Sequence, residues 1–387
     1  MKRMLVSALA IGLIWPGAAS AEIVVGFVTG LSGAVSSIGI PIGKGIAAGQ
    51  VYRGEIDGEP IRVIELDDAS DPSMAARNTR KLVEQEKVDA LIGTSGAPQT
   101  VAMATIAVEL KVPMVAVSPI TPPPTGEGGP WVVQSLQPQL LLFQGIVGHM
   151  KANKVKTVAF IGFNDALGDL MYSSLVESAK EAGINIVANE RYARTETSVT
   201  GQILKIVSQR PDAIVIGGTA TPAALPALAL AERGYKGLVY GNNGMISADF
   251  LRVAGKAANG IICPTGPVIV AEQLPDSNPT KKVSIAYRET YQKANNAPAI
   301  DGFSPYAFDG WVILTDAIKR AKATGAKSGT PEFRAAIRAA LYSTKELAGA
   351  YGVYNFTPAS TYGVDERSVT LVKIDNGAWK LLPAATP

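Results

Sequence analysis

The chain has 387 residues, of which 36 are basic and 33 acidic, so its formal charge at pH 7 is +3. A balance this close to neutral gives no electrostatic reason to bind nucleic acid or an anionic membrane surface. The sequence has one cysteine, Cys263, and one histidine, His149. These counts exclude an internal disulfide and a metal site with two histidine ligands.

The first 21 residues have the pattern of a secretory signal peptide. Lys2 and Arg3 form a basic start, residues 4–15 are apolar, and Ala19-Ser20-Ala21 supplies a cleavage site. The apolar run is too short to span a bilayer, which takes roughly 20 residues. We expect a soluble, periplasmic protein of 366 residues (387 minus 21) with a formal charge of +1. This length indicates about two domains at roughly 100–200 residues each. A retained membrane anchor is the alternative.

Apolar runs and helical patterns alternate in the first third of the chain. Helices are predicted from Pro72 onward, with Asp71 as the N-terminal cap, and over residues 98–110. They separate strands that we predict at 23–28, 61–66, 88–92 and 112–117. This order is typical of a parallel sheet that is covered by helices on both faces.

A loop rich in proline and glycine, residues 118–130, interrupts the alternation, which then resumes. Strands are predicted at 155–161, 184–187, 213–216, 238–240 and 260–263, and helices at 166–182, 199–208 and 222–233. Two such series predict an α/β protein with two doubly wound, Rossmann-like lobes. A hairpin closes the chain, with residues 368–374 and 378–381 as strands and Asn376-Gly377 as the turn. Helices between 279 and 341 separate it from the second series, which suggests lobes made of non-contiguous segments.

The turn after the predicted strand 88–92, Gly93-Thr-Ser-Gly-Ala-Pro-Gln-Thr100, is rich in small polar residues. Ser95 resembles a nucleophile, but no base lies near it in the sequence and no G-x-S-x-G motif is present. The chain also has no phosphate-binding P-loop. Backbone N–H groups at the start of the following helix could instead hold a small carboxylate, with hydroxyls from Ser95 and Thr100. A simple N-terminal cap by Thr94 or Ser95 is an equally good interpretation of this stretch alone.

Four other predicted strand ends lead into similar loops. They are Thr29-Gly-Leu-Ser-Gly33, Ser118-Pro-Ile-Thr121, Gly217-Gly-Thr-Ala-Thr-Pro222 and Gly241-Asn-Asn-Gly244. Because the carboxyl ends of parallel strands meet at one edge of a sheet, these loops predict the two faces of a ligand cleft. Asp67 and Asp68 lack a nearby third ligand, so we assign them turn and capping roles and expect no metal.

Several motifs, in this order and spacing, carry a family likeness. They are Ile23-Val-Val-Gly-Phe-Val-Thr-Gly-Leu-Ser-Gly33, Leu66-Asp-Asp-Ala-Ser-Asp-Pro72, Leu91-Ile-Gly93, Asp165-Ala-Leu-Gly168, Ala231-Glu-Arg-Gly-Tyr-Lys236 and Tyr306-Ala-Phe-Asp309. The chain resembles the periplasmic solute-binding proteins of ABC transporters in the branched-chain amino-acid (leucine/isoleucine/valine) group. This resemblance implies a type I periplasmic binding fold with a hinged cleft, no catalytic residue, no cofactor and a monomer that delivers its ligand to a membrane permease. It places lobe 1 at 22–140 plus 268–348 and lobe 2 at 141–267 plus 349–387.

The resemblance also implies a set of ligand-binding residues. The ligand carboxylate would meet Ser95, Gly96, Ala97 and Thr100 in one loop, and Ile120 and Thr121 in the next. Aromatic residues that flank the ligand in the family correspond here to Ile38, Leu167 and Thr219, while Phe303 retains an aromatic ring. The acidic residue that binds the α-ammonium group corresponds to Asn243.

The neutral Asn243 leads to a hypothesis about the ligand. An ammonium group buried without an anionic partner costs several kcal/mol. We therefore expect a carboxylate without an ammonium group, such as an aromatic or other organic acid, with Ile38, Leu167 and Phe303 at its apolar end. The alternative is a branched-chain or other amino acid, with an acid such as Asp165 replacing the missing charge. A serine hydrolase and a sensory receptor subunit are further alternatives.

Overall fold

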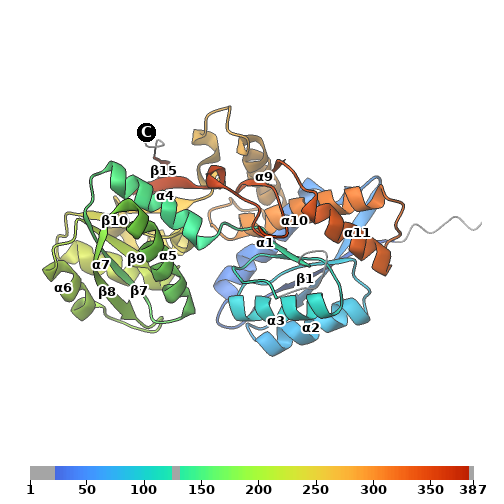
Figure 1. Cartoon of the computed structure of the whole chain (residues 1–387), viewed down its shortest axis with the longest axis horizontal. Helices are drawn as coiled ribbons and strands as arrows, with labels where there is room; N and C mark the ends of the chain where they lie inside the picture. Colours follow the sequence, from blue (N-terminus) through green and yellow to red (C-terminus); the bar gives the residue numbers. More distant parts are fainter. Residues whose placement is uncertain (1–21, 124–130, 383–387) are drawn as a thin grey trace, which may run out of the picture.

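The computed structural model describes residues 22–123 and 131–382 of the chain. The predicted signal peptide and residues 124–130 of the proline- and glycine-rich loop lie outside these ranges. The protein forms two α/β lobes that lie side by side (Figure 1), as the alternating sequence pattern predicts. No helix within the described ranges combines the length and apolar character needed to cross a membrane.

The first sheet has the strand order β2-β3-β1-β4-β5-β6. All neighbouring pairs are parallel except β2 with β3. Its strands are β1 (Ile23–Thr29), β2 (Glu55–Ile56), β3 (Glu59–Asp67), β4 (Ala90–Gly93), β5 (Met114–Ala116) and β6 (Val132–Gln134). Strands β1 and β4 are buried along their whole length, as expected for a sheet covered on both faces.

The second sheet has the order β15-β14-β11-β10-β9-β7-β8. Its parallel strands are β7 (Thr157–Phe163), β8 (Asn185–Tyr192), β9 (Ala213–Gly217), β10 (Leu238–Tyr240) and β11 (Ile262–Thr265). The predicted terminal hairpin, β14 (Thr370–Asp375) and β15 (Ala378–Leu381), adds antiparallel strands to its edge. Asn376 and Gly377 both have positive φ (48° and 74°), which a two-residue type I′ turn requires.

The helices cover both sheets. They are α1 (Ser36–Tyr52), α2 (Pro72–Glu84), α3 (Ala97–Glu109), α4 (Gln139–Ala152), α5 (Ala166–Ala182), α6 (Thr200–Ser208), α7 (Ala224–Glu232), α8 (Ala248–Ala254), α9 (Lys281–Asn295), α10 (Ser304–Lys322) and α11 (Pro331–Tyr342). Asp71 caps α2 as predicted, since its carboxylate accepts the N–H of Met74. Two short strands, β12 (Leu347–Ala348) and β13 (Val353–Tyr354), pair with each other.

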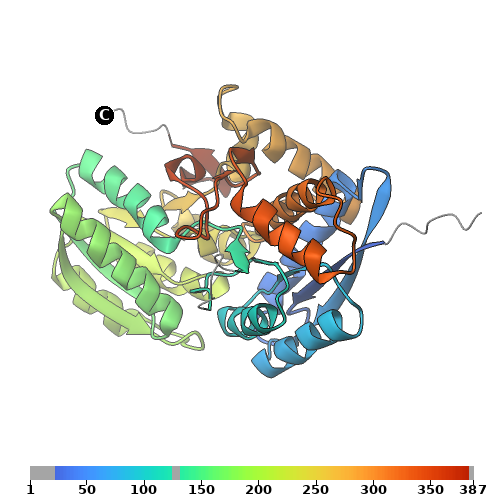
Figure 2. The same ribbon diagram turned by 45° about the vertical axis from the view of Figure 1, so that its right-hand side comes forward.

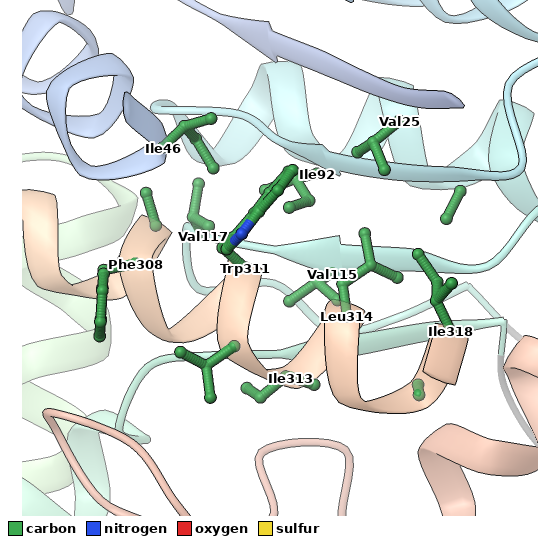
Figure 3. Close-up of a cluster of buried hydrophobic side chains, with 14 of the residues drawn as sticks. Val25, Ile46, Ile92, Val115, Val117, Phe308, Trp311, Ile313, Leu314 and Ile318 are labelled. Atoms are coloured by element: carbon green, nitrogen blue, oxygen red, sulfur yellow. The ribbon is translucent and has the colours of Figure 1, made fainter. Parts of the chain in front are cut away.

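Segments far apart in the sequence build the core of the first lobe. Helix α10 packs against α1, and its Trp311 is fully buried beside Ile46, Ile92 and Val117 (Figure 3). In both overall views α10 and α11 lie with the elements at the start of the chain (Figures 1 and 2). The chain therefore crosses between the lobes after β6, after β11 and after β13. The exact lobe boundaries stay a prediction.

A buried carboxylate fixes the last of these crossings. Asp309, on α10, is fully buried and accepts the N–H groups of Ala350 (2.6 Å) and Tyr351 (2.8 Å) and the hydroxyl of Tyr354 (2.7 Å). Burial raises the pKa of Asp309 to about 7, because removal from water penalises the charged form more than these donors stabilise it. These hydrogen bonds hold residues 350–354, just before the chain crosses to the second lobe, against α10.

Replacing Trp311 by alanine is expected to destabilise the protein by about 3–5 kcal/mol, because it leaves a large cavity and removes the hydrogen bond from Nε1 to the Arg53 carbonyl oxygen. Urea-induced unfolding, followed by circular dichroism, measures this change. The control is Val176→Ala, an exposed position on α5, for which we expect a change within about 0.5 kcal/mol. Equal effects of the two substitutions would contradict the assigned core.

Asp309 should also give the protein a measurable pH dependence. Its pKa is about 7 when folded, against about 3.9 for an unfolded aspartate. Between these values the folded state holds one more proton, so the contribution to stability falls as pH rises. The free energy of unfolding of the wild type minus that of Asp309→Asn should therefore fall by up to about 1.4 kcal/mol per unit between pH 4.5 and 6.5. A constant difference in urea titrations across this range would contradict the shift.

Candidate functional site

The N-terminus of α3 presents free backbone donors at the end of β4. The helix begins after Gly96, which is its N-cap residue and offers no side chain to cap it. Within the part of the chain that the structure describes, no acceptor pairs with the N–H groups of Ala97 and Gln99. Pro98 between them has no N–H group. Unpaired donors at a helix start carry partial positive charge, so this turn is suited to a carboxylate.

Ser95 lies beside these donors and is 5% exposed. Its Oγ accepts the N–H of Gly30 in the loop after β1 (3.0 Å), which leaves the hydroxyl proton free for a further acceptor. The hydroxyl of Thr94 donates instead to Asp68. The alternative interpretation, in which Thr94 or Ser95 only caps the helix, is wrong, because Gly96 is the N-cap residue and no side chain caps the helix there.

Thr100 supports the same turn from inside. It is fully buried, and its Oγ1 lies 2.8 Å from the carbonyl oxygen of Gly96 and accepts the N–H of Thr94 (3.3 Å). In this arrangement the hydroxyl of Thr100 is engaged in stabilising the turn, whereas the sequence led us to expect a contact with the ligand carboxylate. Asp67 has a comparable role, since its carboxylate accepts the N–H of Ala69 (2.7 Å) and the hydroxyl of Ser32 (2.6 Å).

Ile120 and Thr121 follow β5, the neighbour of β4 in the sheet. The N–H of Ile120 donates to Oε1 of Gln134 on β6 (3.0 Å), so it is already paired. Ile120 is buried, whereas Thr121 is exposed. The structure thus places this loop beside the α3 turn, with Thr121 exposed at its surface.

The four predicted contacts to the non-polar part of a ligand lie in both lobes. Ile38, on α1, and Phe303, just before α10, are half-buried and pack against the first core. Leu167, in the first turn of α5, is half-buried against the cores of the second lobe. Thr219 is buried and follows β9, at the carboxyl end of that strand.

Asn243 follows β10 in the second lobe and contacts the first. Its Nδ2 donates to the hydroxyl of Tyr306 on α10 (3.0 Å), and its Oδ1 accepts from Nε2 of Gln139 (3.4 Å). A backbone hydrogen bond from Gly302 to the carbonyl oxygen of Ile246 (2.9 Å) joins the lobes at the same place. The carboxyl end of β10 therefore lies between the two lobes.

Two glutamines of the first crossing were not predicted as site residues. Gln137 and Gln139 are buried, yet the Oε1 atom of each has no hydrogen-bond partner in the described part of the chain. Buried polar atoms are nearly always paired, so these two oxygens need an explanation. Their signal in the sequence, Gln134-Ser-Leu-Gln-Pro-Gln139, contains repeated amides but follows no motif that identifies a binding site.

Asp165, the acid considered as a replacement charge, is engaged elsewhere. Its carboxylate caps α5 by accepting the N–H groups of Leu167 (3.0 Å) and Gly168 (3.1 Å). It also forms an ion pair with Arg194 (2.6 Å), whose guanidinium stacks on Phe163. A ligand ammonium group would have to compete with this arginine for the carboxylate.

The groups that hydrolysis would require are not brought together. His149 lies on α4, where its Nδ1 is 2.8 Å from the hydroxyl of Tyr240. It lines an open pocket of about 740 Å³ that contains none of the predicted ligand-binding residues. Burial raises the pKa of the Cys263 thiol to about 12, which disfavours the reactive thiolate. Within the described residues, no group of three histidine, cysteine or acidic side chains is placed to hold a metal ion.

Comparisons with known proteins agree with this architecture. The Periplasmic binding protein family profile matches residues 22–378. A Leu/Ile/Val-binding protein homolog from Brucella melitensis is 23% identical over 367 residues, with 93% of each chain covered. The crystal structure of an extracellular ligand-binding receptor from Rhodopseudomonas palustris HaA2 has a TM-score of 0.84 and 41% identity, over 93% of this chain and 99% of that one.

A third similar protein was solved with its ligand. It is the branched-chain amino acid transporter substrate binding protein LivJ from Streptococcus pneumoniae in complex with isoleucine. It has a TM-score of 0.74 and is 23% identical, covering 93% of this chain and 99% of its own. The family profile spans nearly the whole chain, and the sheets have the predicted two-lobe arrangement. The protein therefore belongs to the periplasmic binding protein family.

Proposed function

We propose that this protein is the periplasmic solute-binding component of an ABC transporter and that it binds a branched-chain amino acid between its lobes. The observation that carries the proposal is the α3 turn, whose free N–H groups at Ala97 and Gln99 suit a carboxylate. The aromatic or other organic acid that Asn243 first suggested is not supported by the similar proteins. The amino-acid alternative fits their names better.

The carboxylate of such a ligand would be bound by the first lobe. The hydroxyl of Ser95 and the N–H of Ala97 would supply donors to the carboxylate. Gly96 lies between them and has no side chain, so the side chain of Gln99 can pack against the turn. A Cβ atom at position 96 would come within 2.1 Å of Oε1 of Gln99. Thr100 holds the turn and Thr121 offers a further hydroxyl from the next loop.

The aliphatic side chain would contact Ile38, Leu167 and Phe303, which are half-buried and therefore keep apolar surface to offer. Removing a leucine-sized side chain from water contributes roughly 1.5–3 kcal/mol to binding. Ile38 and Phe303 belong to one lobe and Leu167 to the other, so closure of the lobes would bury the ligand from both sides.

The proposal includes the route to the periplasm and the partner. Residues 1–21 would act as a signal peptide that is removed on export. The closed, ligand-bound form would be recognised by the membrane permease of the transporter. The protein would act as a monomer, without a cofactor and without turnover of its ligand.

Ligand screening tests the proposal. Leucine, isoleucine or valine should raise the thermal unfolding midpoint, because a ligand that binds only the folded state stabilises it by about 2.7 kcal/mol at 100 times its Kd. Benzoate and phenylacetate, which lack an ammonium group, serve as comparison ligands. Stabilisation by these acids with no response to any amino acid would contradict the proposal and restore the organic-acid hypothesis.

The carboxylate site has its own test. Ser95→Ala removes a hydroxyl that is expected to donate to a charged group, so affinity should fall by roughly 10- to 100-fold in titration calorimetry. The matched control is Ser173→Ala, an exposed serine on α5, which should leave affinity unchanged. An unchanged Kd in Ser95→Ala, with the fold intact by circular dichroism, would remove Ser95 from the site.

A further inference from the structure

The first crossing between the lobes contains two buried oxygens without partners. Oε1 of Gln137 and Oε1 of Gln139 have no hydrogen bond among the described residues, although these side chains are only 1% and 6% exposed. An unsatisfied buried acceptor costs about 1–3 kcal/mol. A binding partner that supplies donors would relieve this cost.

Of these two glutamines, Gln139 is the one that contacts Asn243, which lies between the lobes. It is the first residue of α4, and its Nε2 contacts Oδ1 of Asn243 at 3.4 Å. Asn243 in turn contacts Tyr306 of the first lobe. Nε2 of Gln137 instead donates to the carbonyl oxygen of Ser368 (3.0 Å).

Neither of the two described positions considered for this role, 243 and 165, supplies a free carboxylate. Asn243 is neutral, and Asp165 is occupied by Arg194 and by the N-terminus of α5. The side-chain acceptors described at this place include the amide oxygens of Gln139 and Asn243. An amino acid carries no net charge as a zwitterion, so neutral oxygens can receive its N–H donors while its own carboxylate balances its charge.

We propose that Oε1 of Gln139, together with Oδ1 of Asn243, accepts hydrogen bonds from the ammonium group of the bound amino acid. Gln139 is then the residue that distinguishes an amino acid from the corresponding acid without an amino group. This inference rests on the proposed function, because it requires an amino acid as the ligand. The family has an acidic residue at position 243 to bind the ammonium group. In this proposal two neutral oxygens, from Gln139 on α4 and Asn243 after β10, take its place.

The test compares leucine with 4-methylpentanoate, which is leucine without its amino group, by titration calorimetry. Gln139→Leu should weaken leucine binding by tenfold or more and change binding of 4-methylpentanoate by less than about threefold. Gln139→Glu should restore or strengthen leucine binding and weaken 4-methylpentanoate further, because the new carboxylate attracts the ammonium group and repels the acid. The glutamate also suits the N-terminus of α4, so this variant should fold.

The matched control is Gln144→Leu, the same change at an exposed position of α4. It should alter neither affinity, and thermal unfolding should confirm the fold of every variant. If the wild type does not bind 4-methylpentanoate detectably, that selectivity supports the proposal. The deciding result is then leucine binding, which should be lost in Gln139→Leu and recovered in Gln139→Glu.

Two results would overturn this inference alone. One is a wild type that binds leucine and 4-methylpentanoate equally well. The other is a leucine affinity that Gln139→Leu leaves unchanged, or that falls in Gln139→Leu and does not recover in Gln139→Glu. A wild type that binds no amino acid at all would instead overturn the proposed function, and this inference with it.

Discussion

Parallel strand order determines where this protein can bind a ligand. Consecutive parallel strands need a crossover, so their carboxyl ends, and the loops that follow, gather at one edge of the sheet. In the first lobe the order β1-β4-β5 brings Gly30, Ser95 and Ile120 into neighbouring loops. The hydrogen bond from Gly30 to Ser95 is a direct result. The helix that leaves β4 then supplies the N–H groups on which the proposed carboxylate site depends.

Several polar groups in this region pair with residues of other elements of the fold. Thr94 donates to Asp68, Ile120 to Gln134, and Asn243 to Tyr306. These contacts use the donors and acceptors that hold the loops in place. Among the described residues, the groups without a partner include the N–H groups of Ala97 and Gln99 and the amide oxygens of Gln99, Gln137 and Gln139. The proposed function uses the N–H groups for the ligand carboxylate and the Gln139 oxygen for the ammonium group.

Most of the fold could be predicted from the alternation of apolar runs and helical patterns. Helix α5 has the predicted bounds, Ala166–Ala182, and the terminal hairpin turns at Asn376-Gly377 as expected. Helix α1 was not predicted, because glycine and proline lower its helix propensity. Two of its glycines are needed for packing: a Cβ at Gly39 would lie 2.0 Å from the Gly30 carbonyl oxygen, and one at Gly45 would lie 2.1 Å from that of Ser304.

The site was harder to predict than the fold. The α3 turn was recognisable because small polar residues between a strand and a helix indicate an anion-binding helix N-terminus from a short stretch of sequence alone. Gln139 has no such local signal. Its proposed role rests on its contact with Asn243, more than a hundred residues away, and on an oxygen that has no partner among the described residues. The same holds for Asp165, whose pairing with Arg194 removes it as a substitute charge and cannot be inferred from sequence spacing.

The most direct measurement is the identity of the natural ligand. Mass spectrometry of small molecules released by denaturing the protein, after purification without added ligand, would show what it binds. Leucine, isoleucine or valine in stoichiometric amount is the result we predict. An aromatic or other organic acid without an amino group would contradict the proposed function and show that the neutral side chain of Asn243 reflects a ligand with no ammonium group.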